Sequence, residues 1–139
     1  MLGIPEARDK PATIATMYSA KVLDHFEHPR NAGEVADPDA SAQLENPACG
    51  DILKLTMKSD AGRVTDIRFL AKGCVPTMAC ASALTELLKG KSIADAEQLG
   101  GEELVAAVGG LPEASSHAAH LAMDTLTALL KQLATADSK

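Results

Sequence analysis

The chain has 139 residues, the length of one ordinary domain, which can bury roughly two thirds of its unfolded surface without a disulfide framework. Its 13 basic and 19 acidic residues give a net charge of -6, and the basic residues form no run. The sequence also has no tryptophan and only three other aromatic residues. It therefore lacks the positive patch and the stacking side chains that nucleic-acid binding uses, and nucleic acid is not an expected partner.

A membrane partner is not expected either. No apolar run approaches the roughly 18 residues of a membrane span, and the first sixteen residues lack the pattern of a signal peptide. Three cysteines, an odd number, argue against structural disulfides and for thiols that do chemistry or fill space. We expect a cytoplasmic protein.

The sequence predicts one domain over residues 17–134. Residues 1–16 contain two prolines and mixed charge without a period, which is typical of a flexible extension, and residues 135–139 are expected to form a short tail. Apolar residues spaced by four predict a first helix, which a proline ends, and a loop follows to residue 39. The residues that define this helix are Tyr18, Val22, Phe26 and Pro29.

Alternating apolar and polar residues predict an antiparallel hairpin in the middle of the chain. One strand is expected around 53–58 and the next around 66–71, with turn residues at 59–62 between them. A weaker strand is expected to precede them at 42–45.

After Gly73 the apolar pattern becomes helical. A helix that ends at Gly90 is followed by two short helices, one starting near Ser92 and one over 102–108. The longest helix is expected from Ser115 or Ser116 to about Leu133. Its apolar stripe consists of Ala118, Leu121, Ala122, Thr125, Leu129 and Leu133. Strands followed by helices predict an α+β fold, a small antiparallel sheet covered by helices.

Two cysteines lie at the ends of predicted strands. Cys49 and Asp51 flank Gly50 on an exposed bend directly before a strand, and Cys74 lies between a strand and a helix. Backbone N–H groups and the helix dipole favour a thiolate at Cys74. Because strand ends can meet in space, the two thiols can come together although they are distant in sequence.

His117 is expected in the first turn of the last helix, whose positive end disfavours protonation and leaves a ring nitrogen to bind metal. With Cys49, Asp51 and Cys74 it would form a site of two sulfurs, one nitrogen and one oxygen. Such a set suits zinc or an iron–sulfur cluster. The spacing alone leaves open that these residues serve only packing and local structure.

Five groups of residues between Tyr18 and about Leu133 form a characteristic series in order and spacing. They are Asp24-His25-Phe26 with Pro29-Arg30-Asn31-Ala32-Gly33, Cys49-Gly50-Asp51, Lys72-Gly73-Cys74, Leu84-Thr85-Glu86 with Lys89-Gly90-Lys91, and Leu111-Pro112 with His117 and Leu121-Ala122. Through them the chain resembles the IscU/NifU family of iron–sulfur cluster assembly scaffolds. The resemblance implies a three-stranded antiparallel sheet packed by helices.

The resemblance also implies a carrier, not an enzyme. In this family a nascent [2Fe-2S] cluster is built with sulfur from a cysteine desulfurase and is passed to apo client proteins. Cys49, Asp51, Cys74 and His117 match family positions that bind zinc, iron or the cluster. Under this hypothesis Asp51 is a labile ligand that aids release.

The chain departs from the family pattern at two places. Ala118 stands where the family has a third cysteine, which the resemblance implies is the acceptor of sulfur. Residues 111–115 lack the second proline and the lysine of the family's chaperone-recognition segment, so hand-off through a dedicated chaperone is not expected. The lost thiolate predicts a more labile cluster. Two alternatives stay open: a zinc-holding protein that carries persulfide on Cys49 or Cys74, and a regulatory pseudo-scaffold with a retired site.

Four other side chains are expected to have structural roles. Cys80 lies on the predicted core face of its helix, which favours packing over ligation or a disulfide with Cys74. His25 and His28 are three positions apart and could bind metal, but surface or capping roles are favoured. His120 is expected to face solvent.

Overall fold

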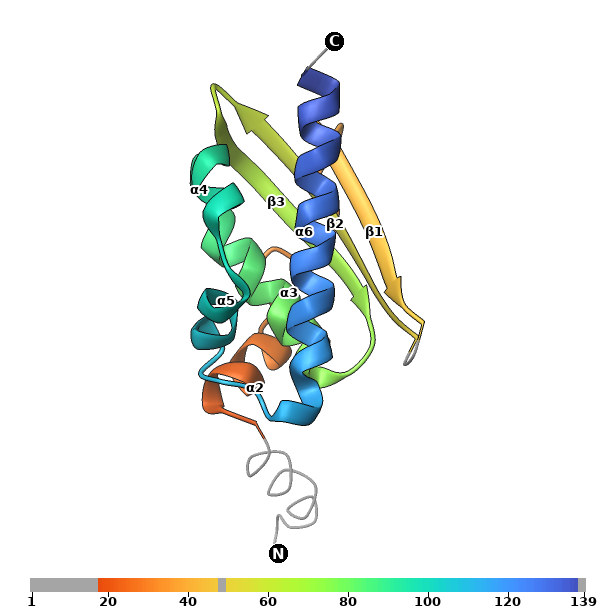
Figure 1. Cartoon of the computed structure of the whole chain (residues 1–139), viewed down its shortest axis with the longest axis vertical. Coiled ribbons are helices and arrows are strands. Elements are labelled where there is room, and N and C mark those ends of the chain that lie inside the picture. Colours follow the sequence, from red (N-terminus) through yellow and green to blue (C-terminus); the bar gives the residue numbers. More distant parts are fainter. Residues whose placement is uncertain (1–17, 48–49, 138–139) are drawn as a thin grey trace, which may run out of the picture.

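Three antiparallel strands, in the order β1-β2-β3, form a sheet against which the longer helices pack (Figure 1). The computed structural model describes residues 18–47 and 50–137. The elements are α2 (Ala20–Glu27), β1 (Ala40–Asn46), β2 (Asp51–Asp60), β3 (Arg63–Lys72), α3 (Val75–Leu88), α4 (Ile93–Gln98), α5 (Gly101–Ala107), the short 3-10 helix η1 (Glu113–Ser115) and α6 (Ser116–Asp137). The predicted α+β fold is confirmed.

The register of the sheet follows the predicted alternation. β1 pairs with β2 from Ala40 opposite Met57 to Asn46 opposite Asp51, and β2 continues into a hairpin with β3. Ala61 and Gly62 both have positive φ angles, 53° and 78°, which a two-residue hairpin turn of this hand requires. The apolar face predicted for β2 is buried, and it consists of Leu53, Leu55 and Met57.

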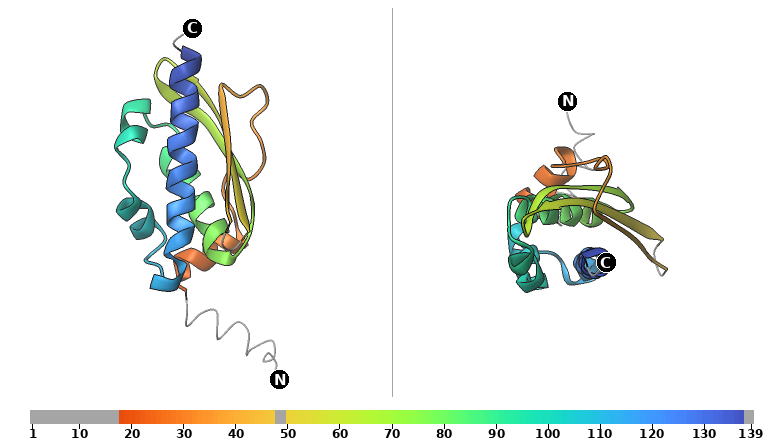
Figure 2. Two further views of the ribbon diagram at one scale, coloured as in Figure 1. Left: turned by 45° about the vertical axis from the view of Figure 1, so that its right-hand side comes forward. Right: turned by 90° about the horizontal axis from the view of Figure 1, so that it is seen from above.

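The core lies between the sheet and the helices α3 and α6 (Figure 2). Helix α6 packs on β1 and β2, and its predicted apolar stripe is buried throughout. It continues to Asp137, past the predicted end near Leu133. Helix α3 is buried on most sides between α2, β3 and α6, and it presents mostly small side chains there. Small residues allow close approach of these elements, which accounts for a core with few aromatic side chains.

The first helix differs from its prediction in the face that it buries. Val22 is buried as expected, but Phe26 is 39% exposed and His25 is buried at 6%. The surface role predicted for His25 is therefore wrong. Its Nδ1 lies 2.8 Å from the hydroxyl of Ser82 in α3, which gives the imidazole a polar partner inside the protein. His28 is exposed, as expected.

The segment between α2 and β1 runs along the sheet and is tied to it by backbone hydrogen bonds. The Gly33 N–H donates to the Phe69 carbonyl (2.8 Å), and the Phe69 N–H donates to the Asn31 carbonyl (3.0 Å). The Val35 N–H donates to the side chain of Thr56 in β2. In the described part of the chain, no helix combines the length and the apolar character needed to cross a lipid bilayer.

Candidate metal centre

Three elements bring candidate ligands to one end of the sheet, the lower end in Figure 1. Asp51 is the first residue of β2, Cys74 follows β3, and His117 is the second residue of α6. The antiparallel register sets the start of β2 beside the end of β3, with Ile52 opposite Lys72. The hairpin therefore places Asp51 and Cys74 close together, and α6 brings His117 to the same end.

The local structure at each strand end follows from the residues there. Gly50 has a φ of 76°, which a glycine adopts without steric cost, and its N–H donates to the Asn46 carbonyl (2.7 Å). Cys74 is the N-cap of α3, and Pro76 lies in the first turn, where its missing N–H costs no helical hydrogen bond. The predicted helix start after Gly73 is confirmed, and the thiol lies at the positive end of the helix.

The three ligand atoms lie at distances that suit a single metal ion. The Cys74 Sγ is 3.4 Å from the Asp51 Oδ2 and 3.8 Å from the His117 Nε2, and the His117 Nε2 is 3.6 Å from the same Asp51 oxygen. Tetrahedral zinc, with metal–sulfur bonds of about 2.3 Å and metal–nitrogen or metal–oxygen bonds of about 2.0–2.2 Å, requires ligand separations of about 3.4–3.6 Å. The sulfur–oxygen and nitrogen–oxygen distances fall in this range, and the sulfur–nitrogen distance of 3.8 Å is slightly longer.

The Asp51 carboxylate is buried, at 5% exposure, although the sequence predicted an exposed bend. Gly73 explains the burial: a Cβ at this position would lie 2.5 Å from the Asp51 Oδ1 and 2.6 Å from its Cγ. The carboxylate thus lies directly against the Gly73 backbone. Around it, Cys74 is partly exposed and the His117 side chain is 36% exposed, so the site opens to solvent on the histidine side.

A fourth residue, Thr77, belongs to this cluster, although the sequence did not predict it. Its hydroxyl donates to the Asp51 Oδ2 over 2.6 Å and lies 3.3 Å from the Cys74 Sγ. The position of Thr77 could have indicated this contact. Thr77 lies three residues after the N-cap Cys74, and side chains at that position can form hydrogen bonds with groups at the start of the helix.

The remaining candidates fall into three groups. Cys49 lies outside the described residues. Cys80 is fully buried, and burial raises the pKa of its thiol to about 12, so its predicted packing role is confirmed. Ala118 is 1% exposed and belongs to the core. His120 is exposed, as expected.

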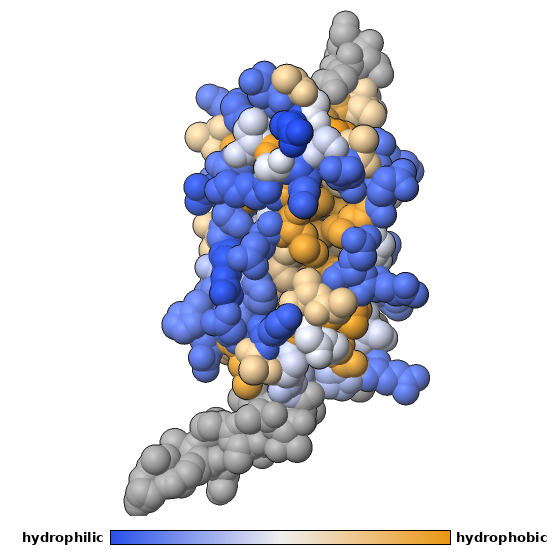
Figure 3. Space-filling model, turned by 90° about the vertical axis from the view of Figure 1, so that its left-hand side faces the viewer, coloured by the Kyte–Doolittle hydropathy of each residue, from blue (hydrophilic) through white to orange (hydrophobic). Residues whose placement is uncertain are grey.

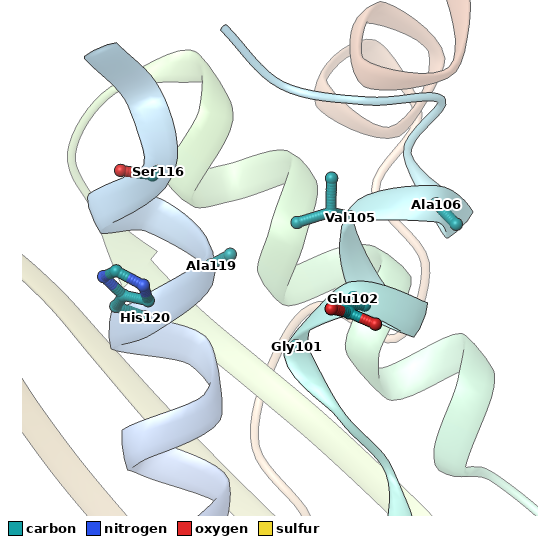
Figure 4. Close-up of a pocket in the computed structure, with 7 residues that line it drawn as sticks. All are labelled: Gly101, Glu102, Val105, Ala106, Ser116, Ala119 and His120. Carbon is teal, nitrogen blue, oxygen red and sulfur yellow. The ribbon is translucent and has the colours of Figure 1, made fainter. Parts of the chain in front are cut away.

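Two pockets lie on α6, and one of them adjoins the candidate centre. A pocket of about 310 Å³ is lined by His117 together with His120 and Asp124 from the next turns and with the end of β1. A pocket of about 530 Å³ lies between α5 and α6, where Val105 and Ala119 face each other (Figure 4). The face that carries α4 and α5 shows an apolar area bordered by hydrophilic residues (Figure 3). The lining of this second pocket does not include the converging ligand atoms.

The fold and the site together define a class of protein: a small α+β domain with a cysteine, a carboxylate and an imidazole gathered at one end of its sheet. The chain belongs to the NifU-like N terminal domain family, whose model matches residues 17–138.

Two relatives support this membership. The chain is 41% identical over 110 residues to the iron-sulfur cluster assembly scaffold protein IscU 1 of Archaeoglobus fulgidus, covering 79% of this chain and 72% of that protein. It is 38% identical over 117 residues to the iron-sulfur cluster assembly scaffold protein IscU of Escherichia coli (strain K12), covering 81% and 91%. A crystal structure of a NifU-like protein (N-terminal) from Brucella abortus shares the fold, with a TM-score of 0.72, 20% identity and coverage of 88% and 97%.

Proposed function

We propose that this chain is an iron–sulfur cluster assembly scaffold, a carrier and not an enzyme. Its cargo is an iron or zinc ion or a transient [2Fe-2S] cluster, held by Cys49, Asp51, Cys74 and His117. Sulfur is supplied by a cysteine desulfurase, and the cargo passes to apo client proteins. The observation that carries the proposal is the convergence of the Asp51 Oδ2, the Cys74 Sγ and the His117 Nε2 within 4.8 Å of one another.

The mixture of ligand atoms suits a carrier. A thiolate is a soft ligand that binds zinc and iron firmly, whereas carboxylate oxygen prefers harder cations and holds iron–sulfur units less well. A site with one oxygen and one nitrogen among its ligands therefore holds cargo less firmly than four thiolates would. The inclusion of Cys49 is supported by the sequence, since only Gly50 separates it from Asp51.

We also propose a cytoplasmic location for this activity. Ligand thiols must stay reduced to bind metal, and the cytosol keeps cysteines reduced. The odd number of cysteines supports the same proposal.

A second candidate function is sulfur transfer by a zinc-holding form of the same site. The observation that favours it is Ala118, a buried methyl group at the position where the related family has its third thiol. Because the site has one cysteine ligand fewer than the family pattern, it suits one zinc ion better than a two-iron cluster. Incubation with a desulfurase and cysteine, followed by persulfide labelling, distinguishes the functions. Label on Cys49 or Cys74 supports transfer, and absence of label with unchanged desulfurase turnover excludes it.

Metal binding and anaerobic reconstitution test the main proposal. We expect the protein to take up zinc stoichiometrically and, with iron, sulfide and thiol, to develop a visible chromophore. The Cys74→Ser and His117→Ala variants should lose both properties, because each loses a ligand. His120→Ala is the matched control, since His120 is exposed three residues from His117 on α6 and should bind cargo normally. Sub-stoichiometric iron and no chromophore in the unaltered protein would refute the scaffold function.

A further inference from the structure

We infer that Thr77 is a positioning residue for the metal centre, which holds the Asp51 Oδ2 toward the Cys74 Sγ and the His117 Nε2. This inference rests on the proposed function of the site. Thr77 is not part of any ligand motif in the sequence. The inference predicts that its hydroxyl raises the affinity of the site for metal, which can be measured.

The contacts of Thr77 single out one oxygen of the carboxylate. The Thr77 hydroxyl donates to the Asp51 Oδ2 over 2.6 Å, the length of a charge-assisted hydrogen bond from a hydroxyl to a carboxylate. That same oxygen lies 3.4 Å from the Cys74 Sγ and 3.6 Å from the His117 Nε2. The oxygen that the threonine holds is therefore the oxygen that converges with the other two ligand atoms.

The surroundings of Thr77 make this hydrogen bond rigid. The side chain is 1% exposed, so water does not compete for the hydroxyl. Its branched Cβ restricts the rotation of χ1, and its backbone belongs to the first turn of α3, where Pro76 also limits φ. On the far side of the carboxylate, the Gly73 backbone leaves no space for a shift of Oδ1. Asp51 is thus held between Gly73 and Thr77.

The chemistry of the hydroxyl determines what it does when metal binds. A threonine has one hydrogen to donate, and that hydrogen goes to Asp51, so Thr77 does not donate to the Cys74 Sγ, and the Cys74 thiol itself donates to the same Asp51 oxygen over 3.4 Å. When zinc replaces the thiol proton, the proton leaves to solvent and the bond from Thr77 to Asp51 stays in place. The carboxylate keeps its orientation in the empty and in the loaded site, which lowers the cost of ordering it on binding.

Removal of the hydroxyl tests the inference with zinc alone as the probe. Thr77→Val keeps the shape of the side chain, and we expect it to weaken zinc affinity by about 10-fold, the lower end of the range for groups that orient metal ligands. Thr77→Ser keeps the hydroxyl and should restore affinity to near that of the unaltered protein. Thr125→Val is the control, because Thr125 is also fully buried but donates to the Leu121 carbonyl within α6.

A double-mutant cycle separates positioning from a general effect on packing. In an Asp51→Ala background, Thr77→Val should cause no further loss of zinc affinity, since the hydroxyl then has no carboxylate to hold. With cobalt in place of zinc, Thr77→Val should alter the visible ligand-field spectrum while the far-ultraviolet circular dichroism stays the same.

The outcomes distinguish this inference from the proposed function. If the unaltered protein binds no zinc and assembles no cluster, the proposed function fails. If it binds zinc and Thr77→Val binds equally well, or if the loss persists in the Asp51→Ala background, the positioning role of Thr77 is refuted while the metal site stands. If the Thr77→Val protein does not fold, Thr77→Ser becomes the test. That variant must then retain affinity to within a few-fold, and a 10-fold loss would refute the inference.

Discussion

Helix α3 carries hydroxyl and thiol side chains at its start and in its middle, and the two regions use them differently. At the start, Cys74 and Thr77 gather around the Asp51 carboxylate. In the middle, Ser82 accepts a hydrogen bond from the Arg30 N–H (2.8 Å), and the Thr85 hydroxyl accepts one from the Asn31 side-chain amide (3.2 Å). The hydroxyl groups in the middle of α3 thus hold the segment after α2 in place by hydrogen bonds. The side chains at the start of α3 instead belong to the partly exposed candidate metal centre at the end of the sheet.

The partners and the solvent access of two histidines near α3 explain why one is structural and the other is a candidate ligand. The His25 Nδ1 lies 2.8 Å from the Ser82 hydroxyl, a normal hydrogen-bond length, its Nε2 lies 3.6 Å from the Glu86 carboxylate, and the residue is enclosed by protein. The His117 Nε2 lies 3.6 Å from the Asp51 carboxylate and 3.8 Å from the Cys74 thiol, and its side chain is partly exposed. Polar clusters with similar residues can therefore be distinguished by their partners and their access to solvent.

The largest difference expected between the two regions is in thiol reactivity. Burial raises the pKa of Cys80 from 9.0 to about 12. At pH 8 this shift leaves about 1000-fold less thiolate than an ordinary cysteine has. We expect iodoacetamide to label Cys74 and to leave Cys80 unlabelled in the folded protein, as measured by peptide mass mapping. Labelling in guanidinium provides the control, in which both should react. Equal labelling of the two cysteines in the native protein would contradict the expectation that burial makes Cys80 less reactive than Cys74.

A smaller effect is expected from Gly73→Ala. The added Cβ would lie within 2.6 Å of the Asp51 side chain, so the carboxylate must move away from the other ligand atoms. We expect zinc affinity to fall by roughly 10- to 100-fold, comparable to the loss of a group that orients a ligand, with little change in helix content. Gly101→Ala is the matched control, because its Cβ would meet only a Met123 side-chain atom at 3.8 Å. Unchanged affinity in Gly73→Ala would show that the packing of Asp51 does not matter for binding.

The smallest effect expected is the pH dependence that comes from His25. Burial, followed by the nearby Arg30, lowers the pKa of His25, and the carboxylates of Glu86 and Asp24 partly oppose this shift. The unfolded state therefore takes up the proton first, and the stability contributed by neutral His25 is complete above about pH 6.5 and is lost as the pH falls toward the folded-state pKa.

Urea unfolding between pH 7.5 and 5 measures this dependence. The unaltered protein should lose stability as the pH decreases, and His25→Gln should show a shallower decrease because glutamine does not titrate. The other histidines contribute equally to both proteins, so the difference between the two curves reports His25 alone. If the free energy of unfolding depends on pH in the same way in both proteins, protonation of His25 is not coupled to folding.

The sequence predicted the elements well wherever local pattern determines structure. The alternation in β2, the turn at Gly62 and the cap at Ser92 were recognised because period, φ requirement and capping depend on neighbouring residues. The family motifs likewise indicated the fold, and they named the converging residues Asp51, Cys74 and His117. Their role as ligands stays a prediction.

What only the tertiary structure decided is the orientation of single side chains between elements. The sequence did not reveal that α2 buries His25 and exposes Phe26, because the choice depends on Ser82, 57 residues away in α3. Nor did it reveal that Asp51 is enclosed by Gly73 and Thr77, since these contacts form only after the strands pair. Local patterns determine which residues form a helix or a strand. The burial and spacing of ligand atoms depend on packing between segments that are distant in sequence, because only the folded chain brings those segments into contact.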